Sequence, residues 1–167
     1  QLKHHDALIR SYPIRLGFDP IGHKQFEGDE KTPEGRTALR SYGSMSYAGL
    51  LSFIYAKLSA DDPRVAAVKE WLGKNYTVEE NPGMGAQGLY YYYQTMAKAL
   101  TAANVDRLQL DSGKKADWRT ELANKLLSAQ REDGSWVNSN GRWMESNPTL
   151  VTSYTVLALE QILDSIP

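Results

Sequence analysis

Aromatic and charged side chains gather in three short segments of this 167-residue chain, "LRSYGSM", "NPGMGAQGLYY" and "GRWMESNP". Each segment leads into a largely apolar stretch, so the three occupy equivalent places. Tyrosine, tryptophan, arginine and glutamate can bind a ligand by stacking, hydrogen bonding and ion pairing. The alternative is that these residues only pack the loops together. The candidate ligand-binding residues are Arg40, Tyr42, Gln87, Tyr90, Tyr91, Arg142, Trp143 and Glu145.

Four consecutive tyrosines occupy residues 90–93. Successive residues on a helix lie about 100° apart, so the four rings cannot all face one cavity. We expect two or three of them to pack between helices, with their hydroxyls bonded to the backbone or to water. The alternative is that Tyr91 or Tyr92 points into a cavity, where its electron-rich ring could stabilise a carbocation or stack on a ligand.

Composition excludes several kinds of chemistry. The chain has no cysteine, so it can form no disulfide, thiolate metal site or cysteine nucleophile. The three histidines, His4, His5 and His23, form no metal-ligand pattern with nearby carboxylates, and the sequence predicts no metal and no cofactor. A formal net charge of -1 gives no reason to expect a nucleic-acid partner.

The longest apolar runs fall short of the roughly 20 residues that a membrane span requires. The first residues, "QLKHHDALIR", contain no signal-peptide core. We therefore expect a soluble fragment or processed product with no membrane span, and the sequence leaves its compartment open.

Proline and glycine interrupt the first 40 residues too often for a long regular element, which predicts an irregular N-terminal arm over residues 1–40. The composition changes at residue 41, where a stretch of apolar and small residues begins. Residues 41–58 carry no charge before Lys57, and residues 87–103 and 148–163 are also largely apolar. These three stretches are expected to be helices that are buried on all sides.

Two amphipathic stretches, "DDPRVAAVKEWLGKNY" and "ADWRTELANKLLSAQ", separate the apolar ones. Asp62 can cap the first turn of the earlier one, with Pro63 at its first helical position. The apolar stripes are Val65, Val68 and Leu72 in the first and Trp118, Leu122 and Leu126 in the second. Strand-like alternation bounded by hairpin turns does not occur in the sequence, so the predicted fold class is all-α.

The alternation of buried and amphipathic helices predicts a helical-hairpin repeat, in which each unit buries its apolar face only against its neighbours. The buried helices align on Tyr47, Tyr93 and Tyr154, and an insertion near "NVDRLQLDSGKK" lengthens the second interval. The N-termini of the inner helices should then gather at one end, lined by the candidate ligand-binding residues. Their free amides and dipoles would favour an anionic group there.

The stretch "QREDGSW" joins the second amphipathic helix to the last apolar one. Gly134 permits a positive φ that ends the helix, and Gln130 can hydrogen-bond the backbone groups left open at that end. Trp136 is expected to fold back over the helix end as an apolar plug. These three residues, Gln130, Gly134 and Trp136, form the predicted structural motif.

This spacing of glutamine, glycine and tryptophan resembles the QW motif of squalene and oxidosqualene cyclases, whose repeat fold protein prenyltransferase β subunits share. A degenerate counterpart is "NYTVEENPGMG", and the stretches "SYGSMSYAGLLS", "NPGMGAQGLYYYY" and "RWMESNPTLVTSY" are similar to bacterial prenyltransferase and squalene oxidase repeat proteins. The resemblance covers roughly residues 41–163 and implies a squalene-cyclase-like α/α-toroid repeat domain over residues 41–167.

Closed toroids of this superfamily have more helices than this sequence offers, so the expected form is a partial, open arc. The rest of a longer parent chain or a second copy would complete it.

This sequence lacks the residues that the known chemistries of the family require. The DxDD motif of hopene-type cyclases is not matched by "SADDP" or "EGDE", and the zinc site of the prenyltransferases needs a cysteine. Three functions remain open. The domain could bind or convert an isoprenoid or another apolar small molecule, or it could serve binding and assembly without catalysis. As a carbohydrate lyase or hydrolase it would need tyrosine, arginine and possibly His23 to converge in one cleft.

Overall fold

The computed structural model describes residues 30–31, 37–38 and 41–164. Its main elements are five α-helices: α2 (Gly43–Tyr55), α3 (Pro63–Asn75), α4 (Leu89–Ala102), α5 (Trp118–Ser128) and α6 (Pro148–Asp164). The prediction of a mostly helical fold is confirmed. The proposed N-terminal arm falls almost entirely outside the described residues, as do Arg40 and the three histidines.

Short strands and one 3₁₀ turn complete the structure. Strand β1 (Glu30–Lys31) pairs antiparallel with β2 (Thr37–Ala38), and β3 (Leu108–Gln109) pairs with β4 (Lys115–Ala116). The β3–β4 hairpin lies in the expected insertion, where the sequence analysis predicted no strand. The turn η1 (Arg142–Met144) precedes α6.

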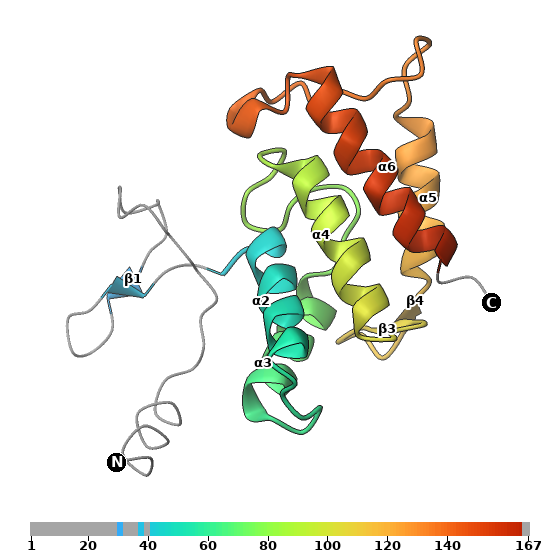
Figure 1. Cartoon of the computed structure of the whole chain (residues 1–167). Coiled ribbons are helices and arrows are strands. Elements are labelled where there is room, and N and C mark those ends of the chain that lie inside the picture. The colour runs from blue at the N-terminus through green and yellow to red at the C-terminus, as the bar shows by residue number, and fades with distance from the viewer. Residues whose placement is uncertain (1–29, 32–36, 39–40, 165–167) are drawn as a thin grey trace.

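The helices form two layers (Figure 1). Helices α2, α4 and α6 lie side by side in one layer and run in the same direction, with α4 in the middle. Helix α3 packs against α2, and α5 packs against α6, to form the other layer. The three apolar stretches of the sequence therefore form one layer, here called the inner layer. The two amphipathic stretches form the other, here called the outer layer.

The two outer helices bury the residues that their periodicity predicted. Val65, Val68 and Leu72 are buried in α3, and Trp118, Leu122 and Leu126 are buried in α5. Asp62 caps α3 by accepting a hydrogen bond from the Arg64 amide at 2.9 Å, directly before Pro63. These local signals were sufficient to predict the buried faces and the N-cap, because capping and periodicity act within one or two helical turns.

The inner helices are less uniform than predicted. Helix α4 buries eight of its fourteen residues, since it has an inner neighbour on each side. The expectation of burial on all sides is wrong for α2 and α6, because each has only one inner neighbour among the described helices. Tyr55 of α2 is 64% exposed, and Val156, Leu157 and Leu163 of α6 are 44%, 46% and 66% exposed.

The "QREDGSW" stretch forms a compact turn after α5. Trp136 is 4% exposed and lies back over the helix, where its indole N–H donates to the Leu126 carbonyl at 2.7 Å. Gln130 donates to the Gly134 carbonyl at 3.0 Å. Gly134 has a φ of +79°, but α5 already ends at Ser128, so the glycine closes a separate turn and does not end the helix.

In the part of the chain that the structure describes, every helix is too short or too polar to cross a lipid bilayer.

Candidate functional site

The segments that enter α2, α4 and α6 lie at the same end of the inner layer, here called the loop end (Figure 1). Tyr42 is the N-cap residue of α2, with a β-region backbone. Tyr90 and Tyr91 lie in the first turn of α4, and η1 contains Arg142 and Trp143. The structure thus gathers the described candidate residues at one end.

Glu145 is fully buried and binds the first turn of α4. Its carboxylate accepts hydrogen bonds from the Tyr91 amide at 2.9 Å and the Tyr90 amide at 3.3 Å. The Asn138 side-chain amide donates a third, at 2.7 Å. A carboxylate at a helix N-terminus satisfies open amides and interacts favourably with the helix dipole. Glu145 therefore caps α4, and both of its oxygens are in use.

Asn81 plays the corresponding part at α2, and the sequence analysis did not identify it. It is 2% exposed, and its side-chain oxygen accepts from the Ser44 amide at 3.0 Å. Its side-chain nitrogen donates to the Gln87 carbonyl at 3.0 Å, which holds the loop that enters α4. Asn81 precedes Pro82, as Asn147 precedes Pro148, and this repeated dipeptide was the available signal.

The helix caps follow one pattern along the inner layer, in which the loop that enters one helix caps the helix before it. The loop that enters α4 supplies Asn81 to α2, and the loop that enters α6 supplies Glu145 to α4. Helix α6 has no later loop among the described residues, and Asn147 accepts from the Thr149 amide in its own first turn at 3.0 Å. Each inner helix thus has first-turn amides bound by a protein side chain.

This arrangement changes the expectation for anionic ligands. The inner N-termini were predicted to offer free amides, but the caps occupy amides in the first turn of all three helices. At α4 the cap is itself a carboxylate, which repels a second anion. A helix N-terminus attracts an anion through its open amides, so the amides that these side chains bind are not available to an anionic ligand.

Three members of the tyrosine run are structural. Tyr90, Tyr92 and Tyr93 are buried, and the Tyr92 and Tyr93 hydroxyls donate to the carbonyls of Thr77 and Val78 at 2.7 and 2.6 Å. Burial is the main cause that raises the pKa of both phenols well above the ordinary tyrosine value. These two hydroxyls therefore remain protonated hydrogen-bond donors at neutral pH.

Tyr91 is the exception in the run. It is 39% exposed, and its ring lies edge-on to Tyr154 of α6, with 5.8 Å between the ring centroids. Tyr92, the other tyrosine considered for a cavity, is fully buried against Tyr47 and Tyr93. Of the two, only Tyr91 can meet a ligand from solvent.

Trp143 and Met144 form the most unusual feature of the loop end. They have φ values of +61° and +63°, the left-handed region that residues other than glycine and asparagine avoid. Their side chains are 56% and 68% exposed. The Arg142 guanidinium carbon lies 4.8 Å from the centre of the Trp143 ring system. Two adjacent strained residues thus present large apolar side chains to solvent.

The local chain explains part of this geometry. The Glu145 amide donates to the Arg142 carbonyl at 3.4 Å, and the Asn138 amide donates to the Glu145 carbonyl at 2.9 Å. These bonds hold Glu145 inward at α4. Met144 and Trp143 are directed outward by the same left-handed turn. The turn that carries the Glu145 cap therefore contains the two left-handed residues, and the cap does not require their exposed side chains to be large and apolar.

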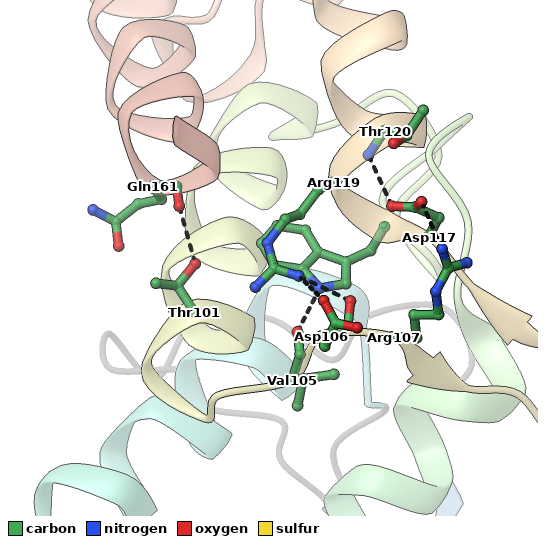
Figure 2. A network of polar contacts seen from close by, with 9 residues as sticks. Thr101, Val105, Asp106, Arg107, Asp117, Arg119, Thr120 and Gln161 are labelled. Carbon is green, nitrogen blue, oxygen red and sulfur yellow. Dashed lines mark hydrogen bonds and ion pairs between the residues drawn. The ribbon is translucent and has the colours of Figure 1, made fainter. Parts of the chain in front are cut away.

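The opposite end of the layer is a contrasting polar region (Figure 2). The indole N–H of Trp118 donates to the Val105 carbonyl at 2.8 Å, and Arg119 donates to the Asp106 carbonyl at the same distance. The Arg107 guanidinium forms an ion pair with Asp117 at 3.3 Å. These contacts join the end of α4 to the start of α5, and we read them as structural.

Among residues 41–164 and the two described strand pairs, no cluster of three histidine, cysteine or acidic side chains could hold a metal ion. Whether tyrosine and arginine meet His23, as the lyase hypothesis requires, lies outside the described residues. The loop end therefore has exposed apolar side chains at Trp143 and Met144 and helix caps that bind first-turn amides. Comparison of the chain with protein-family models, curated proteins and solved structures gives no match, so the resemblance to the QW-motif proteins rests on the sequence motif alone.

Proposed function

We propose that the chain is a squalene-cyclase- and prenyltransferase-like α/α-toroid repeat segment whose role is binding, with an apolar ligand held at the loop end. The succession of caps supports the repeat. In both cases the loop entering one inner helix caps the preceding inner helix. A repeat array produces such equivalent contacts between successive units. The QW-like turn between α5 and α6 also supports this proposal.

The observation that carries the binding role is the exposure of Trp143 and Met144 on a strained backbone. Together with Tyr91 and Arg142 they form the loop-end patch. Large apolar side chains that are exposed together mark interaction sites more often than ordinary surface. Residues in rare backbone conformations also cluster at functional sites. Both features coincide in this patch.

The chemistry of the loop-end patch favours an uncharged, apolar ligand. Tryptophan, methionine and tyrosine offer stacking and dispersion contacts. The patch has one cation, Arg142, and lies beside one buried carboxylate, Glu145, so an anion gains no net advantage. The Tyr90, Tyr91 and Thr149 amides are already bound by protein side chains, which leaves fewer first-turn amides for a phosphate. An isoprenoid chain without a diphosphate group meets these conditions.

Titration with geraniol and with geranyl diphosphate tests the proposal. We expect geraniol to bind at least as tightly as the diphosphate, with saturation-transfer NMR signals along its hydrocarbon chain. The double variant Trp143→Ala/Met144→Ala should weaken binding at least tenfold. The control is Leu127→Ala, which removes an apolar side chain that is 59% exposed on α5 and should not change the affinity.

Two results would contradict the proposal. One is the absence of binding to both probes by the wild-type chain. The other is an equal loss of binding in the Leu127→Ala control, which would mean that the probes adsorb to any exposed apolar side chain.

A further inference from the structure

The outward face of α6 is an apolar surface that no described element covers. Val156, Leu157 and Leu163 are 44%, 46% and 66% exposed, and Ser153 and Glu160 lie beside them at helical spacing. The opposite face of α6, with Val151, Thr155, Ala158 and Ile162, is buried. Helix α6 is thus packed by α4 and α5, and no described element covers its outward face.

Helix α2 is open at the other edge of the layer. Its buried residues include Tyr47 and Leu50, whereas Ser52 and Tyr55 are exposed. Met45 and Ala48 lie on the same outward side as Ser52 and are partly exposed. No residue of this face carries a charge from Gly43 to Tyr55. The layer therefore ends in two helix faces, one at α2 and one at α6, that no element in the described part of the chain covers.

The packing within the layer indicates what these faces accept. Helix α4 packs on α2, and α6 packs on α4, with all three running in the same direction (Figure 1). The relation between α2 and α4 is therefore repeated between α4 and α6. If the same packing is continued by one helix, a further parallel helix lies on the outward face of α6. The equivalent helix that this chain can offer is α2, whose own outward face is open.

Charge complementarity supports the same pairing. Glu160 and Asp164 are exposed near the C-terminal end of α6. Lys57 is exposed directly after the C-terminal end of α2. In a parallel pairing the C-terminal ends of the two helices lie together, so the lysine of one copy meets the acidic pair of the other. An antiparallel pairing would separate these charges by the length of a helix.

We propose that the α6 face of one copy binds the α2 face of a second copy, in a head-to-tail association that continues the inner layer. This inference rests on the repeat relation of the proposed function, and it uses a surface separate from the loop-end patch. A head-to-tail contact uses two different faces, so it forms a ring if the rotation closes and an open chain if it does not.

Sedimentation velocity and light scattering on the full 167-residue chain test this proposal. We expect the apparent mass to rise with concentration. An α6-face variant, Val156→Glu/Leu163→Glu, and an α2-face variant, Ala48→Glu/Ser52→Glu, should each be monomeric with an unchanged helical CD spectrum. Lys69→Glu, on the exposed side of α3, is the control and should associate as the wild type does.

Mixing the two variants provides the decisive measurement. The α6-face variant keeps its α2 face, and the α2-face variant keeps its α6 face, so one intact contact can form between them. We expect a 1:1 dimer that grows no further. A wild-type chain that remains monomeric at every soluble concentration would overturn the proposal. Variants that associate like the wild type would also overturn it, and so would folded variants that fail to form the mixed dimer.

The outcome is independent of ligand binding. Trp143→Ala/Met144→Ala should leave self-association unchanged, because the loop-end patch is not part of either face. Loss of geraniol binding with intact association would contradict only the ligand proposal. Intact geraniol binding by a chain that stays monomeric would contradict only the association.

Discussion

Trp118 and Trp143 lie at opposite ends of the helical layer. Trp118 is fully buried, its N–H is bonded to the Val105 carbonyl, and the Arg119 guanidinium carbon lies 4.6 Å from the centre of its ring system. Trp143 also has an arginine over its ring, but it is 56% exposed and has a left-handed backbone. The cation–π contact is therefore common to both ends, and burial and backbone conformation distinguish them.

This difference is the basis for assigning a structural role to Trp118 and for proposing a binding role for Trp143. A buried indole with a bonded N–H contributes to folding, because its removal leaves a cavity and an unpaired carbonyl. An exposed indole on a strained backbone contributes little to folding. Because residues in rare backbone conformations cluster at functional sites, this position supports the proposal that Trp143 contacts a ligand. Burial and backbone conformation, and not the residue type, thus distinguish the structural tryptophan from the one proposed to bind a ligand.

The largest effect is expected from Trp118→Ala. Removing this buried indole should lower the free energy of unfolding by about 3–5 kcal/mol. Urea denaturation followed by CD measures the change. The matched control on the same helix is Leu127→Ala, which should stay within about 0.5 kcal/mol of the wild type because Leu127 is exposed. A Trp118→Ala protein as stable as this control would show that Trp118 does not stabilise the fold, and it would contradict the comparison of Trp118 with Trp143.

Glu145→Ala is expected to have the next largest effect. The change leaves the Tyr90 and Tyr91 amides without their acceptor and leaves the Asn138 side-chain amide with the Ala86 carbonyl as its remaining acceptor, at a cost of roughly 2–3 kcal/mol. Amide hydrogen exchange should accelerate at Tyr90 and Tyr91. Glu145→Gln retains one acceptor oxygen and should be less destabilising. Equal stability of the wild type and the alanine variant would show that the cap does not stabilise α4.

The buried tyrosines predict a loss of stability at alkaline pH. Burial raises the pKa of Tyr92 and Tyr93 in the folded state, so these phenols release protons more readily in the unfolded chain. Their contribution is complete below the unfolded-state pKa of about 10 and declines as the pH rises above it. At pH 11 the loss is roughly 1.4 kcal/mol for each phenol.

The variant Tyr92→Phe tests this dependence. It lacks the titrating group, so its stability should fall less between pH 9 and about 11 than that of the wild type. Tyr55→Phe is the control, because Tyr55 is 64% exposed. Identical pH profiles for the wild type and Tyr92→Phe would contradict the assignment of Tyr92 as a buried phenol.

Much of the helical core could be predicted from the sequence because its signals are local. The apolar stripe of Trp118, Leu122 and Leu126 repeats within a few residues, and Asp62 caps a helix that begins at the next residue. The open faces of α2 and α6 could not be predicted in this way, because the apolar composition of a helix does not specify how many neighbours it has.

The organisation of the loop end depends on contacts that are distant in sequence. Glu145 binds an amide that lies 55 residues earlier, and Asn81 binds one that lies 37 residues earlier. No periodic pattern links such pairs, so Glu145 was interpreted as a ligand-binding residue and Asn81 was not identified. The left-handed turn at Trp143 also lacked a local signal, because glycine and asparagine are the residues that usually indicate it.

The smallest expected effect concerns the strained backbone itself. At Trp143 the left-handed conformation costs a residue with a Cβ atom roughly 1 kcal/mol, and glycine avoids this cost. Trp143→Gly should therefore be more stable than Trp143→Ala by up to about 1 kcal/mol. The reverse order is expected at Ala67, an exposed position inside α3, where Ala67→Gly should lower stability by roughly 0.5–1 kcal/mol. Urea denaturation of the three variants measures both differences. If glycine were the less stable residue at position 143 as well, the turn would not be left-handed in solution. The strain argument for the loop-end patch would then fail, whereas the burial argument for Trp118 would be unaffected.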